Sequence, residues 1–198
     1  MKKEYVPERP YILKSGDHAG EALGLLALND IGFLEQQLGI RKQEDKGRKE
    51  ESKIHQHLKW LLGVLKNVKP TAICPICKSR RVEYFMIQTI GENTKINEDH
   101  ICCSGCSDRL LEKAQIGTPL LIPLTFSSLK KFYHYNYKKR RLTPKPIARK
   151  VKKVFLKAFQ IEKTSRLYIF NWFKRKAQTM ELYGFPVEFE GEQSKLIL

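Results

Sequence analysis

The chain has 198 residues with 37 Lys or Arg against 21 Asp or Glu, which gives a net charge of +16 and a pI of about 9.7. This length is enough for one ordinary domain or for two or three small ones. No apolar signal follows Met1, and no apolar run is long enough to span a membrane, since Leu120-Leu121-Ile122 lies between two prolines. We therefore expect a soluble cytoplasmic protein with an anionic partner, nucleic acid before an acidic membrane surface.

A turn with two glycines follows a short predicted strand at residues 11–13. Gly16 and Gly20 lie four residues apart, and glycine permits positive φ angles there. Asn29-Asp30 can cap a helix. The apolar face of that helix is formed by Ile31, Phe33, Leu34 and Leu38.

The pattern Gly16-x-His18-x-Gly20-x-x-Leu23, followed by Asp30-x-x-Phe33-Leu34, resembles the small domain at the C-terminus of exonuclease X. That domain occurs in many otherwise unrelated proteins. The family has lysines where this chain has Asp17 and Ala19, so the resemblance implies a folding or docking module rather than a phosphate contact. None of the acidic catalytic motifs of the nuclease is present. We expect an accessory module over residues 1–40.

Residues 41–69 are predicted to be a charged linker followed by a helix. Residues 41–52 alternate in charge and are interpreted as a solvated helix or linker. His55 and His57 lie two apart and face different sides of the following helix, so they cannot share one site there. We interpret each as a core or surface histidine. The apolar residues that recur at helical spacing are Ile54, Leu58, Leu61, Leu62 and Leu65.

Two pairs of cysteines flank a 25-residue insert: Cys74 with Cys77, and Cys103 with Cys106. Two C-x-x-C pairs at this separation predict one tetrahedral zinc site. The insert predicts a β-hairpin, with a strand over residues 82–90, a turn over 91–95 and a return strand over 96–102.

This arrangement resembles a zinc ribbon over residues 70–112. Free thiols or disulfides are the alternatives, and disulfides would require an oxidising compartment. Cys102 would give a C-x-x-x-C spacing with Cys106, so Cys103 is the expected ligand and Cys102 an ordinary strand residue.

The positive charge is concentrated after the ribbon. Residues 129–176 hold 17 Lys or Arg and one acid, Glu162, which leaves 20 bases and 20 acids elsewhere. Lys and Arg neutralise phosphates, and exposed aromatic side chains stack on unpaired bases. The sequence therefore predicts DNA or RNA binding. The candidate residues are Lys130, Lys131, Tyr135, Lys138, Lys139, Arg140, Arg141, Arg149, Lys150, Lys152, Lys153, Lys174 and Arg175.

Residues 113–198 are predicted to be a basic helical region with a terminal hairpin over residues 187–198. Residues 117–124 read as an extended apolar connector, and Ser127-Ser128 offers an N-cap for a helix ending at residues 138–141. The next helix has an apolar face formed by Ile147, Val151, Val154, Phe155 and Ala158. We expect a last helix that is capped by Thr164 or Ser165. The residues on its buried face are predicted to be Leu167, Phe170, Phe173, Ala177 and Met180.

A catalytic site is not evident in the sequence. Asp99-His100 resembles the HNH endonucleases, but His100 lies only three residues before Cys103. Residues 107–111, directly after Cys106, contain no Asn or His to complete a metal site. Four thiolate ligands leave zinc no open position. We predict an α+β, non-enzymatic protein with a small N-terminal α/β module, a zinc-ribbon hairpin and a basic helical region. The alternatives are an adaptor docking on a nucleoprotein machine (polymerase or ribosome) and a metal-dependent nuclease with an unrecognised site.

Overall fold

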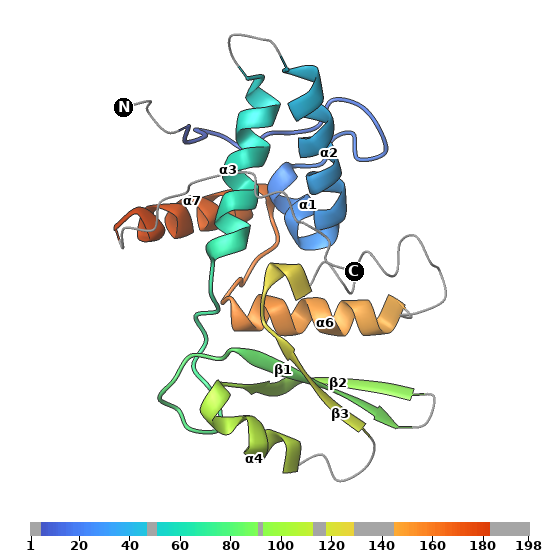
Figure 1. Cartoon of the computed structure of the whole chain (residues 1–198), viewed down its shortest axis with the longest axis vertical. Helices are drawn as coiled ribbons and strands as arrows, with labels where there is room; N and C mark the ends of the chain where they lie inside the picture. Colours follow the sequence, from blue (N-terminus) through green and yellow to red (C-terminus); the bar gives the residue numbers. More distant parts are fainter. Residues whose placement is uncertain (1–4, 47–50, 91–92, 113–117, 129–144, 183–198) are drawn as a thin grey trace, which may run out of the picture.

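The computed structural model describes residues 5–46, 51–90, 93–112, 118–128 and 145–182. A group of helices lies above a three-stranded antiparallel sheet, with α6 between them (Figure 1). The predicted α+β class is confirmed. The elements are α1 (Leu23–Asn29), α2 (Ile31–Glu44), α3 (Lys53–Asn67), β1 (Tyr84–Ile90), β2 (Asn93–Cys102), the 3-10 turn η1 (Ser104–Cys106), α4 (Ser107–Glu112), β3 (Thr118–Pro123), α6 (Lys145–Ala158) and α7 (Arg166–Leu182). None of the described helices is long and apolar enough to cross a bilayer.

The N-terminal module is mostly helical. Its extended segment forms one isolated bridge, Ile12 with Ala22, instead of a strand, and α1 precedes the expected helix. Both turn glycines have positive φ angles, as their position predicts. Asp30 caps α2 by accepting a hydrogen bond of 3.0 Å from the Phe33 N–H. His18 links the turn to this cap, because its Nε2 lies 3.7 Å from Asp30 Oδ2 and its ring lies 4.5 Å from that of Phe33.

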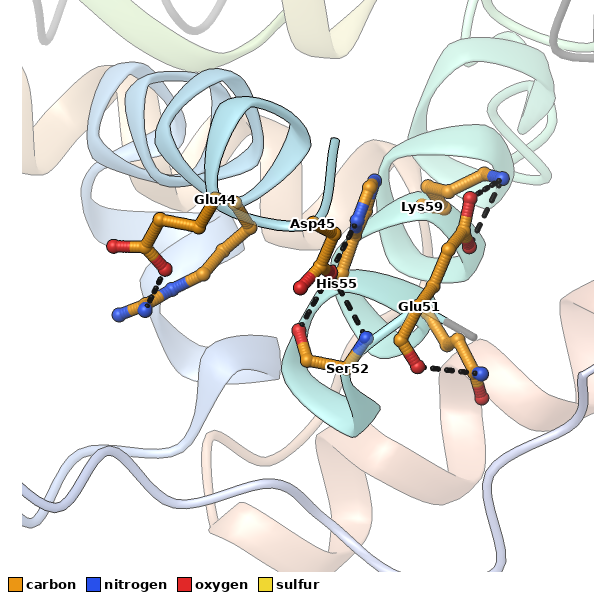
Figure 2. A network of polar contacts seen from close by, with 8 residues as sticks. Glu44, Asp45, Glu51, Ser52, His55 and Lys59 are labelled. Carbon is orange, nitrogen blue, oxygen red and sulfur yellow. Dashed lines mark hydrogen bonds and ion pairs between the residues drawn. The ribbon is translucent and has the colours of Figure 1, made fainter. Parts of the chain in front are cut away.

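A buried polar clasp joins the end of α2 to the start of α3 (Figure 2). Asp45 Oδ2 accepts hydrogen bonds from the Ser52 N–H and the Ser52 hydroxyl, and it lies 2.9 Å from His55 Nδ1. Asp45 and His55 are both buried. The prediction of a solvated helix or linker over residues 41–52 is therefore wrong at Asp45, which is buried. Its carboxylate satisfies the N–H of the residue preceding α3.

We expect Asp45→Ala to lower the free energy of unfolding by about 1–3 kcal/mol, because the half-buried Ser52 and the buried His55 both lose their partner. The neighbouring Glu44→Ala is the control. Glu44 is exposed and, among the described residues, forms an ion pair with Arg41 alone, so this change should cost much less. Chemical denaturation of both variants measures the difference. Equal losses would show that the clasp adds nothing beyond a surface ion pair.

His57 lies in an aromatic cluster that joins α3 to α7. Its ring centroid is 5.8 Å from Tyr11, 5.7 Å from Trp60 and 6.3 Å from Phe170. Burial lowers the pKa of His57 from 6.5 to about 4. The imidazole is therefore neutral in the folded protein at neutral pH, as expected of a core histidine.

This shift predicts a pH-dependent stability. Above pH 6.5 His57 is neutral in both the folded and unfolded states, whereas between pH 6.5 and about 4 only the unfolded state binds the proton. The free energy of unfolding should then fall by up to about 3 kcal/mol over this window. His57→Phe should lose correspondingly less over the same range. Denaturation at several pH values measures both proteins, and identical pH profiles would contradict the assignment.

The sheet has the order β2-β1-β3, so β1 is its central strand. Phe85 lies opposite Ile101 of β2 and Ile122 of β3. The segment expected to be only an extended connector is thus the edge strand β3. Its prolines 119 and 123 suit an edge, because a proline lacks the N–H that a second neighbour would need. One face of the sheet is covered by α6, with the Phe155 ring 5.7 Å from Phe85, and α4 lies on the other side (Figure 1).

The predicted apolar face of α6 is confirmed at Val151, Val154, Phe155 and Ala158, which are all buried. In α7 the predicted stripe is partly wrong. Leu167 is 61% exposed, whereas Ile169 and Trp172 are buried beside Phe170, Phe173 and Ala177. This rotated stripe packs on α1 at Gly24, where an added Cβ would lie 3.3 Å from the Ile169 side chain.

The structure identifies the cap residues of two helices. Of the two predicted caps of α7, Ser165 is the one that accepts a hydrogen bond, of 3.4 Å, from the Tyr168 N–H. A helix begins at Phe126, and its cap is Thr125 rather than the predicted Ser127 or Ser128. The Thr125 hydroxyl accepts a hydrogen bond of 3.1 Å from the Ser128 N–H. The terminal hairpin predicted over residues 187–198 lies outside the described residues.

Candidate metal centre

The first cysteine pair lies in a tight turn just before β1. The Cys74 N–H donates to the Arg80 carbonyl at 2.7 Å, and the Lys78 N–H donates to the Cys74 carbonyl at 2.9 Å. An isolated bridge between Ile73 and Arg81 closes the base of this turn. Lys78 adopts a positive φ of 55°, which lets the chain reverse directly after Cys77.

The second pair follows β2 and leads into α4. The Cys106 N–H donates to the Cys103 carbonyl at 3.0 Å across η1, and the Ser107 hydroxyl donates to the Ser104 carbonyl at 2.8 Å. Because β2 is antiparallel to β1, its end returns to the beginning of β1, where the Glu83 N–H donates to the Cys102 carbonyl at 2.8 Å. The hairpin therefore brings the second turn beside the first.

The sulfur atoms of Cys74, Cys77, Cys103 and Cys106 all lie within 4.8 Å of one another. The Sγ atoms of Cys77 and Cys103 are 3.8 Å apart. Four thiolates placed tetrahedrally at about 2.3 Å from a zinc ion would be about 3.8 Å from each other. The cysteines are free rather than bridged by disulfides. This four-cysteine cluster can hold a metal ion.

The first turn favours the thiolate form of its cysteines. The pKa of Cys77 is lowered to about 5 by the hydroxyl of Ser79 and by the N–H groups of Ser79 and Arg80. Burial alone would raise the pKa of Cys74, but N–H groups from Cys77, Cys103 and Ile76 outweigh it and lower that pKa. The sequence did not lead us to predict a role for Ser79. Its position two residues after Cys77 could have indicated one, because a serine there can donate a hydrogen bond to the cysteine sulfur.

The second turn lacks this support. Burial raises the pKa of Cys106 to about 12, and burial also raises that of Cys103. A bound cation deprotonates such thiols, because a metal ligand must be a thiolate. The first turn therefore favours the thiolate form, whereas the second turn would need a bound cation to favour it.

Cys102 stays outside the cluster. It lies opposite Tyr84 in the β1–β2 pairing and is fully buried, and burial raises its pKa to about 11. An apolar strand position explains its presence without a ligand role.

The structure describes only part of the predicted nucleic-acid site. Arg149, Lys150 and Lys153 are exposed on α6, and Arg175 is exposed on α7. Lys152 is half-buried and donates to Asn29, while the Lys174 ammonium lies 5.8 Å from the Phe170 ring centroid. The remaining candidates lie outside the described residues: Lys130, Lys131, Tyr135, Lys138, Lys139, Arg140 and Arg141.

Asp45, Ser52 and His55 are the residue types of a hydrolytic triad, but their geometry is different. The Ser52 hydroxyl and His55 Nδ1 both contact the same oxygen of Asp45. A nucleophilic serine would instead direct its hydroxyl to the histidine that removes its proton. This group is a helix clasp.

We expect a Cys74→Ser, Cys77→Ser double variant to purify without metal and to lose the ordered hairpin, because metal binding and folding of such a site are linked. Cys102→Ser is the matched control and should keep one metal ion per chain. Elemental analysis of the purified proteins measures the content. A full equivalent of metal in the double variant would exclude this cluster as the site.

Comparison of the chain with protein-family models, with curated proteins and with solved structures found no match. The interpretation of the site therefore depends on its own geometry. That geometry is four cysteine sulfurs from two tight turns, brought together at one end of a β-hairpin.

Proposed function

We propose that this chain is a non-catalytic nucleic-acid-binding protein, in which a structural zinc ribbon positions a basic helical region against DNA or RNA. The observation that carries the proposal is the location of the charge. The whole excess of Lys and Arg lies in residues 129–176, and the described part of that segment buries its apolar side and exposes basic side chains.

Zinc is the metal that best suits the cluster. Thiolate ligands favour soft or borderline metals, and a tetrahedral set of four sulfurs is typical of structural zinc. Three of the four cysteines are buried, and the fourth, Cys77, is half-buried. Four protein ligands fill the tetrahedron, so the ion would have no position for a substrate or a reactive water. Its role would be to hold the two turns together.

The ribbon in turn supports α6. Val151, Val154 and Phe155 are buried, and α6 packs extensively on β2. Arg149 and Lys150 are exposed on the other side of the helix. A fixed helix that presents cations at helical spacing can neutralise several phosphates at once and release their counterions.

The alternative is an adaptor whose ribbon docks on a protein of a nucleoprotein machine. Two apolar side chains of the ribbon region favour it, because Ile73 is 52% exposed and Leu120 on the edge strand β3 is 59% exposed. Isolated exposed apolar residues are common on protein surfaces, so this observation weighs less than the concentrated charge.

We expect the purified chain to bind oligonucleotides with a steep salt dependence, falling by about 10³-fold or more between about 50 and 200 mM salt if six or more phosphates are contacted. Arg149→Glu, Lys150→Glu should weaken binding, and reversal of residues 138–141 to glutamate should weaken it strongly. The control is Lys42→Glu, Lys66→Glu, which reverses two exposed charges on α2 and α3 and should change little.

Salt titrations with single-stranded and duplex probes, followed by fluorescence anisotropy, measure these affinities. Metal content and circular dichroism confirm that each variant is folded. Affinity unchanged in both basic variants would exclude these residues from the interface. Under the adaptor alternative, the native chain itself would bind the probes only weakly.

A further inference from the structure

A recess of about 650 Å³ lies where α6 is joined to α7. Its walls come from the last turn of α6, the connecting residues 159–162 and one side of α7, with Thr71 contributing from the entry to the ribbon. The walls include the apolar or aromatic side chains of Leu156, Ile161, Tyr168 and Trp172. Binding pockets for small organic ligands have volumes of about 300–1,000 Å³, so the recess has the size for one.

Backbone hydrogen bonds fix the walls. The Ala158 carbonyl, at the end of α6, accepts from the N–H groups of both Thr71 and Ala72 at 3.0 Å. Gln160 has a positive φ of 52°, and the next N–H, of Ile161, donates back to the Leu156 carbonyl at 2.8 Å. The recess is therefore a feature of the folded backbone rather than of flexible surface side chains.

Basic side chains surround the recess. Lys157, Arg175 and Lys176 line it, and Glu162 carries the one carboxylate among the described residues that do so. Lys176 is half-buried with its ammonium 5.5 Å from the Trp172 ring centroid. Burial lowers its pKa, and the charges of Arg81 and Arg175 lower it further. In the described part of the chain no carboxylate forms an ion pair with Arg175 or Lys176, so an anion would relieve this repulsion.

Thr71 adds a polar group without a partner. Its hydroxyl oxygen is buried, and among the described residues it makes no hydrogen bond. A buried hydroxyl without a partner is costly and rare in folded proteins, and a ligand is one explanation for it. The hydroxyl belongs to a residue of the same recess that the basic side chains surround.

We infer that this recess binds a nucleotide, with its phosphate at Arg175 and Lys176 and its base or sugar against the apolar wall. Inorganic phosphate alone would leave most of the volume unused. The nucleotide is either free or one unit of a bound single strand. In the second case the inference depends on the proposed function and adds to it the place where one phosphate is held.

Calorimetric titration of the metal-loaded full chain with AMP, GMP, CMP and UMP tests the inference, with adenosine and inorganic phosphate as reference ligands. At least one mononucleotide should bind, inorganic phosphate more weakly, and adenosine not measurably. Arg175→Gln, Lys176→Gln should weaken nucleotide binding by about tenfold or more, since each charged contact removed costs about that much. Lys42→Gln, Lys66→Gln removes the same charge from exposed positions on α2 and α3 and should leave nucleotide binding unchanged.

Thr71→Val is a second variant that keeps the shape of the side chain, and it should weaken nucleotide binding severalfold even if the double variant fails to fold. The inference is overturned if no mononucleotide binds, or if the folded double variant binds as tightly as the native chain. A single-stranded oligonucleotide separates this result from the proposed function. Oligonucleotide binding without nucleotide binding overturns the recess alone, whereas nucleotide binding without oligonucleotide binding supports the recess and overturns the proposed function.

Discussion

The meeting of two cysteine turns at one end of the β1–β2 hairpin is the constraint on which the lower half of the structure depends. A segment as short as residues 70–112 buries too little apolar surface to fold reliably without a metal or a partner. The four sulfurs lie within 4.8 Å of one another, so four ionised cysteines would repel strongly unless a cation lay between them. Metal binding would remove this repulsion and hold β1 and β2 in register. The face that α6 covers would then be fixed as well.

A second set of contacts joins the ends of the described chain. α7 packs on α1 where Gly24 leaves room for Ile169 and Phe173, and Phe170 reaches the aromatic cluster around His57 on α3. The helix that follows the ribbon thus completes the core of the helices that precede it. The polar clasp of Asp45, Ser52 and His55 lies between α2 and α3 (Figure 2). These contacts fix the ends of α2 and α3 relative to each other in a segment that is otherwise rich in charged residues.

Sequence reasoning succeeded where the signal was local. The spacing of the cysteines predicts the cluster that the structure assembles, because two C-x-x-C turns need only a hairpin to meet. The apolar period of residues 147–158 likewise predicts the buried face of α6. Failures came from distant partners. β3 contains two prolines, and its partner residues in β1 lie 29 to 39 positions earlier. Its own residues therefore do not reveal it as a strand. Asp45 is one acid in a charged run, and only its contacts with Ser52 and His55 distinguish it. Leu167 is as apolar as Ile169, and the neighbouring helices decide which of them is covered.

The carbonyl of Ala158 has a consequence for how the chain is organised. It accepts hydrogen bonds from the N–H groups of Thr71 and Ala72, so the chain enters the cysteine-bearing segment and leaves α6 at the same point. The helices α1, α2, α3 and α7 then form a discontinuous unit, and residues 72–158 form an insertion whose two ends touch. Insertions with adjacent ends can be gained or lost with little disturbance to the host unit, because the closing loop is short. The three-stranded sheet with α6 is in this sense a module carried by the helical unit. Among the described residues, the junction at Ala158 and the Lys152–Asn29 contact join this module to the helices, so a ligand bound to the module could affect them through these two places.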